Sequence, residues 1–390
     1  MTYSVVILGS TGSIGNSTLD SIKKRKNYKV KLLTANKNIK KLLSQCIKYN
    51  VKNAIIEDEV KYNKYKFIFK KNKINLHHGF RSINKIIKYK VSFCINSISG
   101  IEGLEPTLNI IPFSKNILIA NKETIICGWH IILKELKKYN TEFIPIDSEH
   151  FSIWKLIKNE KKEIIDKIIL TASGGPFLNV PKRKIINIKP FYALRHPNWK
   201  MGKKISIDSA TMMNKIFEFL EAKKIFNLSK NKLSIIIHPS SYVHAIIYLK
   251  GNIIKLLAHE PLMTIPISNA LGIVNNNKNN NFAKQIKNLN SLKFENPKKK
   301  IFPLLSLIDL IPEKDSYFET ILITINDILV NRYLHGKINY ISIHKNLLRL
   351  IKRPYLTKFY KLKPKNIYDI KKIIKLTGNY LDKRIKYYEK

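Results

Sequence analysis

The stretch YSVVILGSTGSIG, residues 3–15, decides the fold of this chain. Its first six residues predict a short buried strand, and a glycine-rich turn then opens a helix with apolar residues near 18–22. Glycines let a backbone come close to a pyrophosphate, and the N–H groups of a helix start bind its oxygens. The spacing G-x-x-G-x-x-G is a variant of the usual fingerprint, and its position between strand and helix favours a dinucleotide site over a plain glycine turn.

Short apolar segments continue to alternate with helical patterns after this stretch. Segments 30–34, 53–56, 91–96 and 116–120 are apolar enough for strands, and residues 39–49 carry apolar side chains at helical spacing. Such alternation is typical of a doubly wound, mostly parallel sheet. The sequence predicts an α/β protein with an N-terminal Rossmann-like domain over residues 1–147.

The remaining chain predicts three further parts. Residues 148–273 mix longer strands with helices and hold most of the polar clusters, which indicates an α+β catalytic domain. Residues 274–300 contain a run of asparagine and lysine at 275–281, which is typical of a linker. Residues 301–390 repeat apolar pairs at helical spacing and predict a small helical domain.

The end of the second predicted strand bears on the choice of cofactor. An NAD-selective site usually places Asp or Glu there, whereas this chain has TANKN at 34–38. A cation and amides at this point favour the 2′-phosphate of NADPH. Lys37 fits equally well as one more surface lysine, so both interpretations stay open.

Three acidic residues are candidates for a metal site. Asp147 and Glu149 are two positions apart, so in an extended segment they point the same way. Glu218 follows Asn214 by four residues and Lys215 by three, which puts all three on one face of a helix. Carboxylates from the two segments suit a hard cation such as Mg²⁺ or Mn²⁺. Each acid alone fits a surface ion pair, but the chain has only 27 acidic residues.

A second group of residues suits a phosphorylated substrate. The segment TASGGPF, 171–177, ends a predicted strand with a hydroxyl beside two glycines, which suits a phosphate loop. Ser209, Asn214 and Lys215 could complete an anion clamp. Residues 196–204, bounded by proline and glycine, predict a lid that carries Trp199 and Met201. A single tryptophan also fits ordinary packing.

Charge and cysteine content set limits on function. The formal net charge is +44, but the lysines are spread along the whole sequence among isoleucine and asparagine. This spread favours compositional drift over a nucleic-acid surface, so we expect no specific nucleic-acid partner. Three scattered cysteines without a C-x-x-C pair indicate neither disulfides nor a zinc site. With a strand expected from the third residue and no long apolar run, we expect a cytoplasmic protein without a targeting segment or membrane span.

These stretches, together with others, resemble 1-deoxy-D-xylulose 5-phosphate reductoisomerases. The matching segments are 9–15, 118–123, 147–150, 172–177, 196–218, 238–241 and 261–266, in order and at similar separations. The resemblance implies that NADPH and a divalent metal serve a skeletal rearrangement of 1-deoxy-D-xylulose 5-phosphate, followed by hydride reduction to 2-C-methyl-D-erythritol 4-phosphate. It also implies a homodimer.

The resemblance assigns roles residue by residue. The implied NADPH contacts are Thr11, Gly12, Ser13, Ile14, Lys37, Asn38, Asn121, Glu123 and Gly202. The implied metal ligands are Asp147, Glu149 and Glu218, and the implied substrate contacts are Lys122, Ser148, Glu149, Ser173, His196, Ser209, Asn214, Lys215 and Glu218. Glu149 is the candidate for proton movement and Lys122 for electrostatic support of developing oxygen charge, with Asp147 and Glu218 completing the catalytic set.

Two other functions remain as alternatives at this stage. A simple NADPH-dependent sugar-phosphate or polyol-phosphate dehydrogenase would not need the three carboxylates together. A catalytically decayed basic binding protein would associate with nucleic acid in a strongly salt-dependent way. Loss of turnover on addition of EDTA, with rescue by Mn²⁺, would argue against the dehydrogenase, and the intact carboxylates speak against the decayed binding protein.

Overall fold

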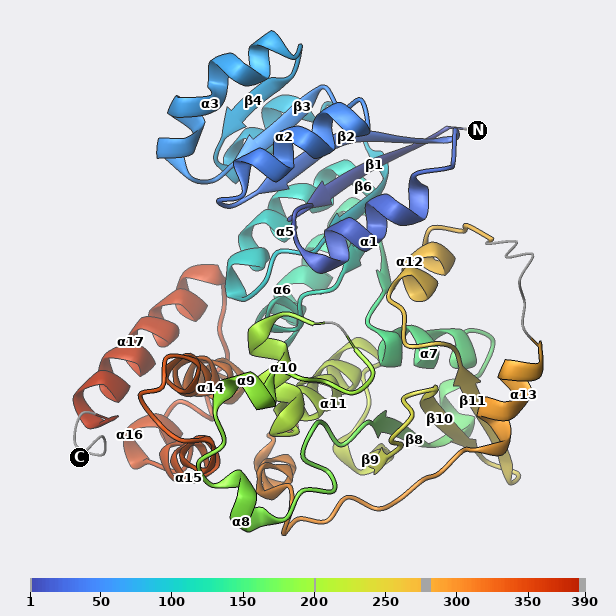
Figure 1. Cartoon of the computed structure of the whole chain (residues 1–390), viewed down its shortest axis with the longest axis vertical. Coiled ribbons are helices and arrows are strands. Elements are labelled where there is room, and N and C mark those ends of the chain that lie inside the picture. Colours follow the sequence, from blue (N-terminus) through green and yellow to red (C-terminus); the bar gives the residue numbers. More distant parts are fainter. Residues whose placement is uncertain (1, 200, 275–281, 386–390) are drawn as a thin grey trace. The chain divides into compact units, whose positions relative to one another are not determined.

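The computed structural model describes residues 2–199, 201–274 and 282–385. Within these residues, strand β1 (Tyr3–Leu8) lies in the middle of a seven-stranded parallel sheet (Figure 1). The strand order is β4-β3-β2-β1-β5-β6-β7. Its strands are β1, β2 (Tyr28–Ala35), β3 (Asn53–Ile56), β4 (Asn75–His78), β5 (Val91–Asn96), β6 (Ser114–Ile119) and β7 (Glu142–Pro145). Helices cover parallel strands on both faces, which explains why Val5–Leu8 are completely buried. The predicted Rossmann-like sheet is confirmed.

The helices of this first unit connect the strands and cover the sheet. They are α1 (Ser13–Ile22), α2 (Ile39–Lys48), α3 (Glu59–Lys71), α4 (Ile83–Ile86), α5 (Leu104–Ile110) and α6 (Lys122–Tyr139). A later helix, α12 (Thr264–Ala270), packs on α1. The hydroxyl of Tyr28 donates to the carbonyl of Leu271 at 2.6 Å, and Arg25 donates to that of Val274 at 2.8 Å.

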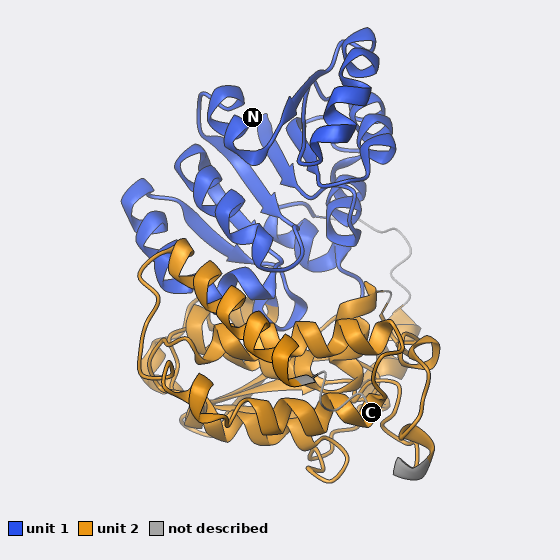
Figure 2. Cartoon of the chain, turned by 90° about the vertical axis from the view of Figure 1, so that its left-hand side faces the viewer, with its two compact units in different colours: residues 1–151, 262–278 blue, residues 152–261, 279–390 orange. Residues whose placement is uncertain are grey.

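The chain divides into two compact units, coloured separately in Figure 2. The first comprises residues 1–151 and 262–278, and the second comprises 152–261 and 279–390. Residues 262–274 thus group with the seven-stranded sheet, although the sequence suggests a continuous domain over 148–273. The helix α7 (Ser148–Ile157) begins in the first unit. The asparagine-rich part of the expected linker, 275–281, lies outside the described residues.

The second unit contains a mixed sheet, which has four strands in the described residues and the order β11-β10-β8-β9. Its strands are β8 (Ile165–Ala172), β9 (Leu233–Ile237), β10 (Val243–Leu249) and β11 (Ile253–Ala258). Strand β8 pairs parallel with β9 and antiparallel with β10. The helix α11 (Met213–Ile225) packs against β8 and β9. This mixture agrees with the α+β segment predicted for this region.

The C-terminal part of the second unit is helical, as predicted. The helices α14 (Phe318–Leu334), α15 (Tyr340–Leu350) and α17 (Ile367–Ile385) pack together, with α14 in contact with both others. The shorter helices of this unit are α8 (Lys182–Ile185), α9 (Pro190–Ala193), α10 (Lys203–Ala210), α13 (Phe282–Asn290) and α16 (Pro354–Thr357). Helix α10 packs on both α11 and α14.

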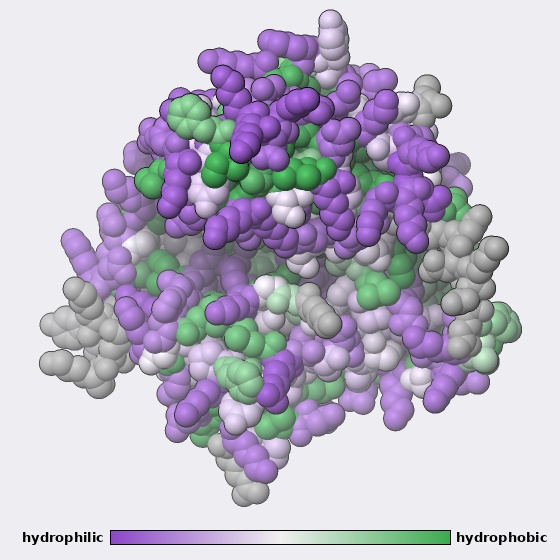
Figure 3. All heavy atoms as spheres, turned by 45° about the horizontal axis from the view of Figure 1, so that its top comes forward, coloured by the Kyte–Doolittle hydropathy of each residue, from purple (hydrophilic) through white to green (hydrophobic). Residues whose placement is uncertain are grey.

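The surface reflects the composition. Figure 3 shows hydrophilic side chains over most of the face that it presents, with apolar side chains between them. No helix in the described parts of the chain combines the length and the apolar character needed to cross a bilayer. The three cysteines, Cys46, Cys94 and Cys127, are buried thiols.

Candidate active site

The glycine-rich loop lies where the strand order reverses, between β1 and β5. In open parallel sheets, ligands bind at the carboxyl ends of the strands at such a point. Gly9 has φ +79°, and a Cβ there would lie 2.9 Å from the carbonyl oxygen of Ser97, just after β5. A Cβ on Gly15 would lie 2.5 Å from the backbone of Ser10. Both glycines are therefore required by close backbone packing, which holds the loop against the sheet.

The start of α1 is free of protein capping. Gly12 occupies the N-cap position and makes no side-chain capping bond, and both Gly12 and Ser13 are exposed. Helix-start N–H groups without a side-chain cap can bind an anion. Thr11 is tied to the next helix, because Lys41 Nζ donates to its carbonyl oxygen at 3.0 Å. The loop is thus held firmly while its outer edge stays open to a ligand.

The residues after β2 adopt a helix start instead of a ribose clamp built on carboxylates. Asn38 is the N-cap of α2, and its side chain accepts from the N–H of Lys41 at 3.3 Å. The carbonyl of Lys37 accepts from Lys61 Nζ at 2.5 Å. This arrangement brings cations to the end of β2, next to the glycine-rich loop.

The start of α6 carries three further candidates. Asn121 is its N-cap and accepts from the N–H of Thr124 at 2.9 Å, while its amide nitrogen donates to the carbonyls of Ile98 and Gly100. Lys122 and Glu123, in the first turn, are both buried. Asn121 therefore fixes the loop after β5 to α6, and this fixes the direction of Lys122.

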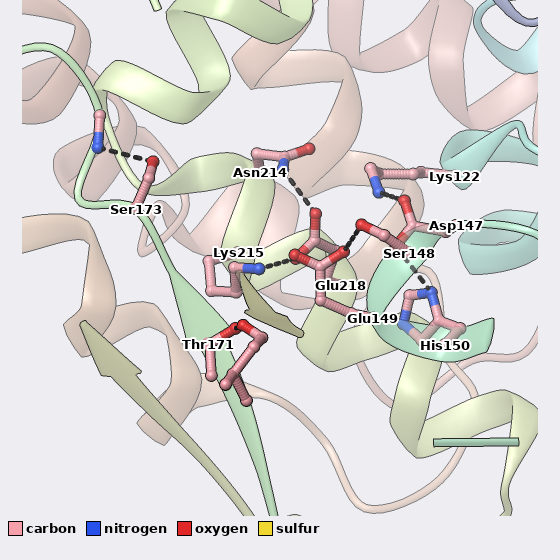
Figure 4. A network of polar contacts seen from close by, with 12 residues as sticks. Lys122, Asp147, Ser148, Glu149, His150, Thr171, Ser173, Asn214, Lys215 and Glu218 are labelled. Atoms are coloured by element: carbon pink, nitrogen blue, oxygen red, sulfur yellow. Dashed lines mark hydrogen bonds and ion pairs between the residues drawn. The ribbon is translucent and has the colours of Figure 1, made fainter. Parts of the chain in front are cut away.

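Lys122, Asp147 and His150 form a compact polar cluster in the first unit (Figure 4). Lys122 Nζ is ion-paired with Asp147 Oδ2, and His150 Nδ1 lies 3.4 Å from Asp147 Oδ1. Burial raises the pKa of Asp147. The Lys122 ammonium and the contact with His150 lower it by more than burial raises it, so the pKa of Asp147 is well below its usual range. Asp147 is therefore ionised at neutral pH.

The expected extended segment at 147–149 is wrong. Helix α7 begins at Ser148, and the carbonyl of Asp147 accepts from the N–H of Phe151 at 2.8 Å, so Asp147 precedes the helix and Glu149 lies in its first turn. An acid before a helix and another in its first turn both suit the helix dipole, which is a local reason for this geometry. Ser148 Oγ donates to Glu149 Oε2 at 2.5 Å.

The second unit holds the other carboxylate, Glu218. Asn214 Nδ2 donates to Glu218 Oε1 at 2.5 Å, and Lys215 Nζ is ion-paired with Glu218 Oε2. The three residues share one face of α11, as their spacing predicts (Figure 4). Lys215 and Glu218 are buried, so each compensates the charge of the other.

Ser173 is prepared to donate a hydrogen bond. His196 Nδ1 accepts from the N–H groups of Asn198 and Trp199, at 3.1 and 3.0 Å. A neutral imidazole with this acceptor carries its proton on Nε2, which lies 3.1 Å from Ser173 Oγ. The same Oγ accepts from the N–H of Gly175 at 3.1 Å. With both acceptor sites used, the O–H proton of Ser173 is left for another acceptor, such as an anionic ligand.

His196 is neutral for an additional reason. Burial and the nearby charge of Lys215 lower its pKa to about 4. Gly175 also brings the Ser173 loop to helix α10, because a Cβ on Gly175 would lie 2.8 Å from the carbonyl oxygen of Ser209. Ser173, His196, Ser209 and Lys215 are therefore neighbours in one unit, as an anion clamp requires.

The predicted lid segment is attached to the loop after β9. Asn198 Nδ2 donates to the carbonyl of Pro239 at 2.7 Å and to Ser241 Oγ at 3.0 Å. The Trp199 ring lies against that of His244, with centroids 6.1 Å apart. Lys200 lies outside the described residues, Met201 is half-buried, and Gly202 caps α10, so residues 203–204 are helical.

Sequence reasoning missed the roles of some polar residues around these clusters. His150 follows Asp147 and Glu149 in the sequence, and its i,i+3 spacing from Asp147 could have revealed the contact. Asp208 and Asn326 meet across 118 residues, and no local pattern predicts such a pair.

The first unit contains a Rossmann-like sheet with an open glycine-rich loop, and the second unit contains a fixed carboxylate near hydroxyl and ammonium groups that suit a phosphate. Together these features indicate the class of a nucleotide-dependent enzyme for a phosphorylated substrate. Three family models match the chain. They are described as 1-deoxy-D-xylulose 5-phosphate reductoisomerase (residues 5–128), its C-terminal domain (143–226) and DXP reductoisomerase C-terminal domain (259–379).

Individual relatives agree along almost the whole length. A protein of Pelagibacter ubique (strain HTCC1062) named 1-deoxy-D-xylulose 5-phosphate reductoisomerase is 48% identical over 375 residues, covering 95% of this chain and 96% of that protein. The Zymomonas mobilis reductoisomerase solved with NADPH has 29% identity and a TM-score of 0.86, covering 97% of both chains. A DOX-P reductoisomerase solved with NADPH, fosmidomycin and magnesium has 29% identity and a TM-score of 0.88, covering 98% and 99%. The chain belongs to the 1-deoxy-D-xylulose 5-phosphate reductoisomerase family.

Proposed function

We propose that this protein converts 1-deoxy-D-xylulose 5-phosphate to 2-C-methyl-D-erythritol 4-phosphate, with NADPH as reductant and a divalent metal as cofactor, in non-mevalonate isoprenoid biosynthesis. The observation that carries the proposal is the 48% identity to a named reductoisomerase over 95% of this chain. The polar clusters of both units supply the chemistry that such a reaction requires.

The metal would be held by Asp147, Glu149 and Glu218. These residues fit the group, because all three offer carboxylate oxygens, Asp147 is ionised, and Glu218 is buried and fixed by two partners. Oxygen ligands suit Mg²⁺ or Mn²⁺. A bound ion supplies Lewis-acid polarisation of the substrate oxygens. Lys122 places a buried ammonium beside this site and stabilises negative charge on a substrate oxygen.

Glu149 is the proposed group for proton movement. It lies in the first turn of α7, where its Oε2 accepts from Ser148 Oγ at 2.5 Å. Ser148 itself, 5% exposed, would contact the substrate. A carboxylate with a hydroxyl partner can take up and return a proton while its position stays fixed.

NADPH would bind at the glycine-rich loop and the helix starts near it. The loop fits a pyrophosphate, because the first turn of α1 has no side-chain cap and Gly9 and Gly15 hold the backbone close to the sheet. The cofactor supplies hydride. We assign its contacts to Thr11, Gly12, Ser13, Ile14, Lys37, Asn38, Asn121, Glu123 and Gly202. Lys37 and Asn38, at the end of β2, account for selection of the 2′-phosphate.

The substrate phosphate would bind to the clamp of the second unit. Ser173 offers its O–H proton, Lys215 offers a buried ammonium, and neutral His196 orients Ser173. Ser209 and Asn214 complete the set, and Trp199 and Met201 would cover the bound substrate. A phosphate held away from the reacting carbons orients them, which is a large contribution to catalysis.

Two further features belong to the proposal. We propose a homodimer, because β11 is an edge strand with exposed apolar side chains at Ile253, Ile254 and Leu256. Such an edge suits self-complementary pairing. We also propose a cytoplasmic location, since buried thiols without disulfides suit a reducing compartment.

The test uses the purified full chain with 1-deoxy-D-xylulose 5-phosphate, NADPH and Mg²⁺ or Mn²⁺. The absorbance of the reduced nicotinamide should fall, and NMR of the product should show the branched carbon skeleton. Chelation by EDTA should stop the reaction, and added metal should restore it. Reduction without rearrangement, or turnover that EDTA does not affect, would indicate a simple dehydrogenase instead.

A further inference from the structure

A buried polar bridge joins α10 to α14. Asn326 Nδ2 donates to Asp208 Oδ1 at 2.7 Å, and Lys204 Nζ lies 3.3 Å from Asp208 Oδ2 and 2.9 Å from Asp327 Oδ1. Asp208 is 2% exposed and Asn326 is completely buried. We call these four residues the α10–α14 bridge.

The bridge fixes one relative position of the two helices. A buried carboxylate costs several kcal/mol unless it is paired and hydrogen-bonded, so the contacts with Asn326 and Lys204 help to make the burial of Asp208 tolerable. A carboxylate cannot donate, so the amide nitrogen of Asn326 must point at it, which also fixes the Asn326 rotamer. Lys204 additionally lies 5.3 Å from the centre of the Phe217 ring on α11. A shift of α10 along α14 would break the Asp208–Asn326 and Lys204–Asp327 contacts together.

The bridge is next to the proposed anion clamp. Asp208 immediately precedes Ser209, and the chain then turns sharply into α11, which carries Asn214, Lys215 and Glu218. Met212 in this corner has φ +64°, a left-handed conformation that costs a methionine free energy. Such a conformation persists only where the surroundings determine it.

A second contact holds the same corner. Tyr340 on α15 donates its hydroxyl to the carbonyl of Ala210 at 2.7 Å. The C-terminal helices therefore hold α10 at Lys204, at Asp208 and at its last residue. Lys204 also lies two residues after Gly202, where the predicted lid enters α10.

We propose that Asp208 and Asn326 are positioning residues for the substrate phosphate. They act through the α10–α11 corner, whose orientation places Ser209 and the face of α11 that carries Lys215. The C-terminal helical region thereby contributes to substrate affinity without touching the substrate. This inference rests on the proposed function for its kinetic readout, but binding of inorganic phosphate tests it independently.

The test compares Asp208→Asn, Asn326→Ser and the exchanged pair Asp208→Asn with Asn326→Asp. Each single variant should raise KM for the sugar phosphate about 10- to 100-fold, because small displacements of orienting groups have effects of this size. The affinity for inorganic phosphate, measured by calorimetry, should fall by a similar factor. KM for NADPH should change little. The exchanged pair restores an amide–carboxylate bond with reversed direction and should recover most of the lost affinity.

Glu319→Gln is the matched control. Glu319 on α14 is also 2% exposed, and it pairs with Lys224 of α11 at 3.0 Å, but it belongs to a different charge cluster. This variant should lower the Tm of the protein. It should leave the KM for the sugar phosphate and the affinity for inorganic phosphate unchanged.

The outcomes separate the possibilities. If Asp208→Asn and Asn326→Ser lower Tm as Glu319→Gln does but leave phosphate affinity and KM unchanged, the bridge is purely structural and the inference is wrong. Failure of the exchanged pair to recover affinity would also overturn it. If Asp208→Asn does not fold, Asn326→Ser gives the same readout with the Lys204–Asp208 pair retained. If the unaltered protein does not oxidise NADPH with the proposed substrate, the proposed function fails, and phosphate affinity still decides the role of the bridge.

Discussion

Lys122 and Asp147 form an ion pair whose side chains are only 7% and 19% exposed. The two groups have different proposed roles, one as an electrostatic catalyst and one as a metal ligand. Their contact means that the ammonium balances the carboxylate before a cation is bound. Metal binding at Asp147 therefore changes the electrostatic environment of Lys122 directly.

Replacing Lys122 by Met should destabilise the metal-free protein. The variant removes the ammonium from beside the buried carboxylate of Asp147 and leaves His150 next to it, and the loss of one partner of a buried pair costs about 3 kcal/mol. The pKa of Asp147 should rise. Thermal unfolding should show a lower Tm without metal, and Mg²⁺ should raise the Tm more than in the unaltered protein.

Lys299→Ala is the control. It removes a pair whose side chains are 69% and 70% exposed, and the Tm of this variant should not change. Equal Tm values for Lys122→Met and Lys299→Ala would contradict this account.

Glu218→Gln should weaken metal binding selectively. The substitution keeps the shape and the bond from Asn214, but it removes a charged oxygen ligand and the negative charge that is paired with Lys215. We expect the concentration of Mg²⁺ for half-maximal activity to rise at least about tenfold, while NADPH binding measured by fluorescence stays the same. Asp166→Asn, at an exposed position on β8, also removes one acidic group and is the control; its metal requirement should not change. An unchanged metal requirement in Glu218→Gln would remove this residue from the ligand set.

Lys37→Glu distinguishes a 2′-phosphate contact from an ordinary surface lysine. If Lys37 contacts NADPH, the ratio of kcat/KM for NADPH to that for NADH should fall by about tenfold or more, in line with the strength of a charged hydrogen bond. Lys48→Glu makes the same charge change at the other end of α2 and should leave the ratio unchanged. Similar ratios in both variants would show that only the general field of the protein acts on the cofactor.

The sequence was most informative where strands are buried. Strands β1, β3 and β5 have the predicted bounds, because buried strands require the apolar runs from which they were predicted. Strands β4, β7 and β11 were missed, and all three are sheet edges. Strand β4, NLHH, has no buried residue, so its conformation depends on pairing with β3 rather than on its own pattern.

In the candidate site, contacts between residues close in the sequence could be predicted, and contacts between distant segments could not. Groups within one helix turn, such as Asn214, Lys215 and Glu218, could be predicted as neighbours from spacing alone. The helix start at Ser148 was missed, because Asp147 and Glu149 were interpreted by strand periodicity. Contacts between distant segments, such as that of Asp208 with Asn326, depend on how helices pack and leave no local trace.

The neutral state of His196 should make the protein sensitive to acid. Its pKa in the folded protein is about 4, below the usual 6.5, so the unfolded chain binds a proton more readily than the native protein does. Above pH 6.5 both states are neutral and the group has no effect. As the pH falls from 6.5 to 4, the free energy of unfolding should decrease, by about 2 kcal/mol once partial solvent exposure is allowed for.

His196→Asn isolates this contribution. Urea unfolding at pH 7 and at pH 4.5 should show a smaller loss of stability in the variant than in the unaltered protein, because other histidines with lowered pKa values, such as His238 and His259, act equally in both. His335→Asn, at an exposed position after α14, should leave the loss unchanged. The variant should also raise KM for the sugar phosphate at pH 7, since Ser173 loses the donor that orients its hydroxyl. If His196→Asn and the unaltered protein lose the same stability between the two pH values, His196 is not held neutral by the fold.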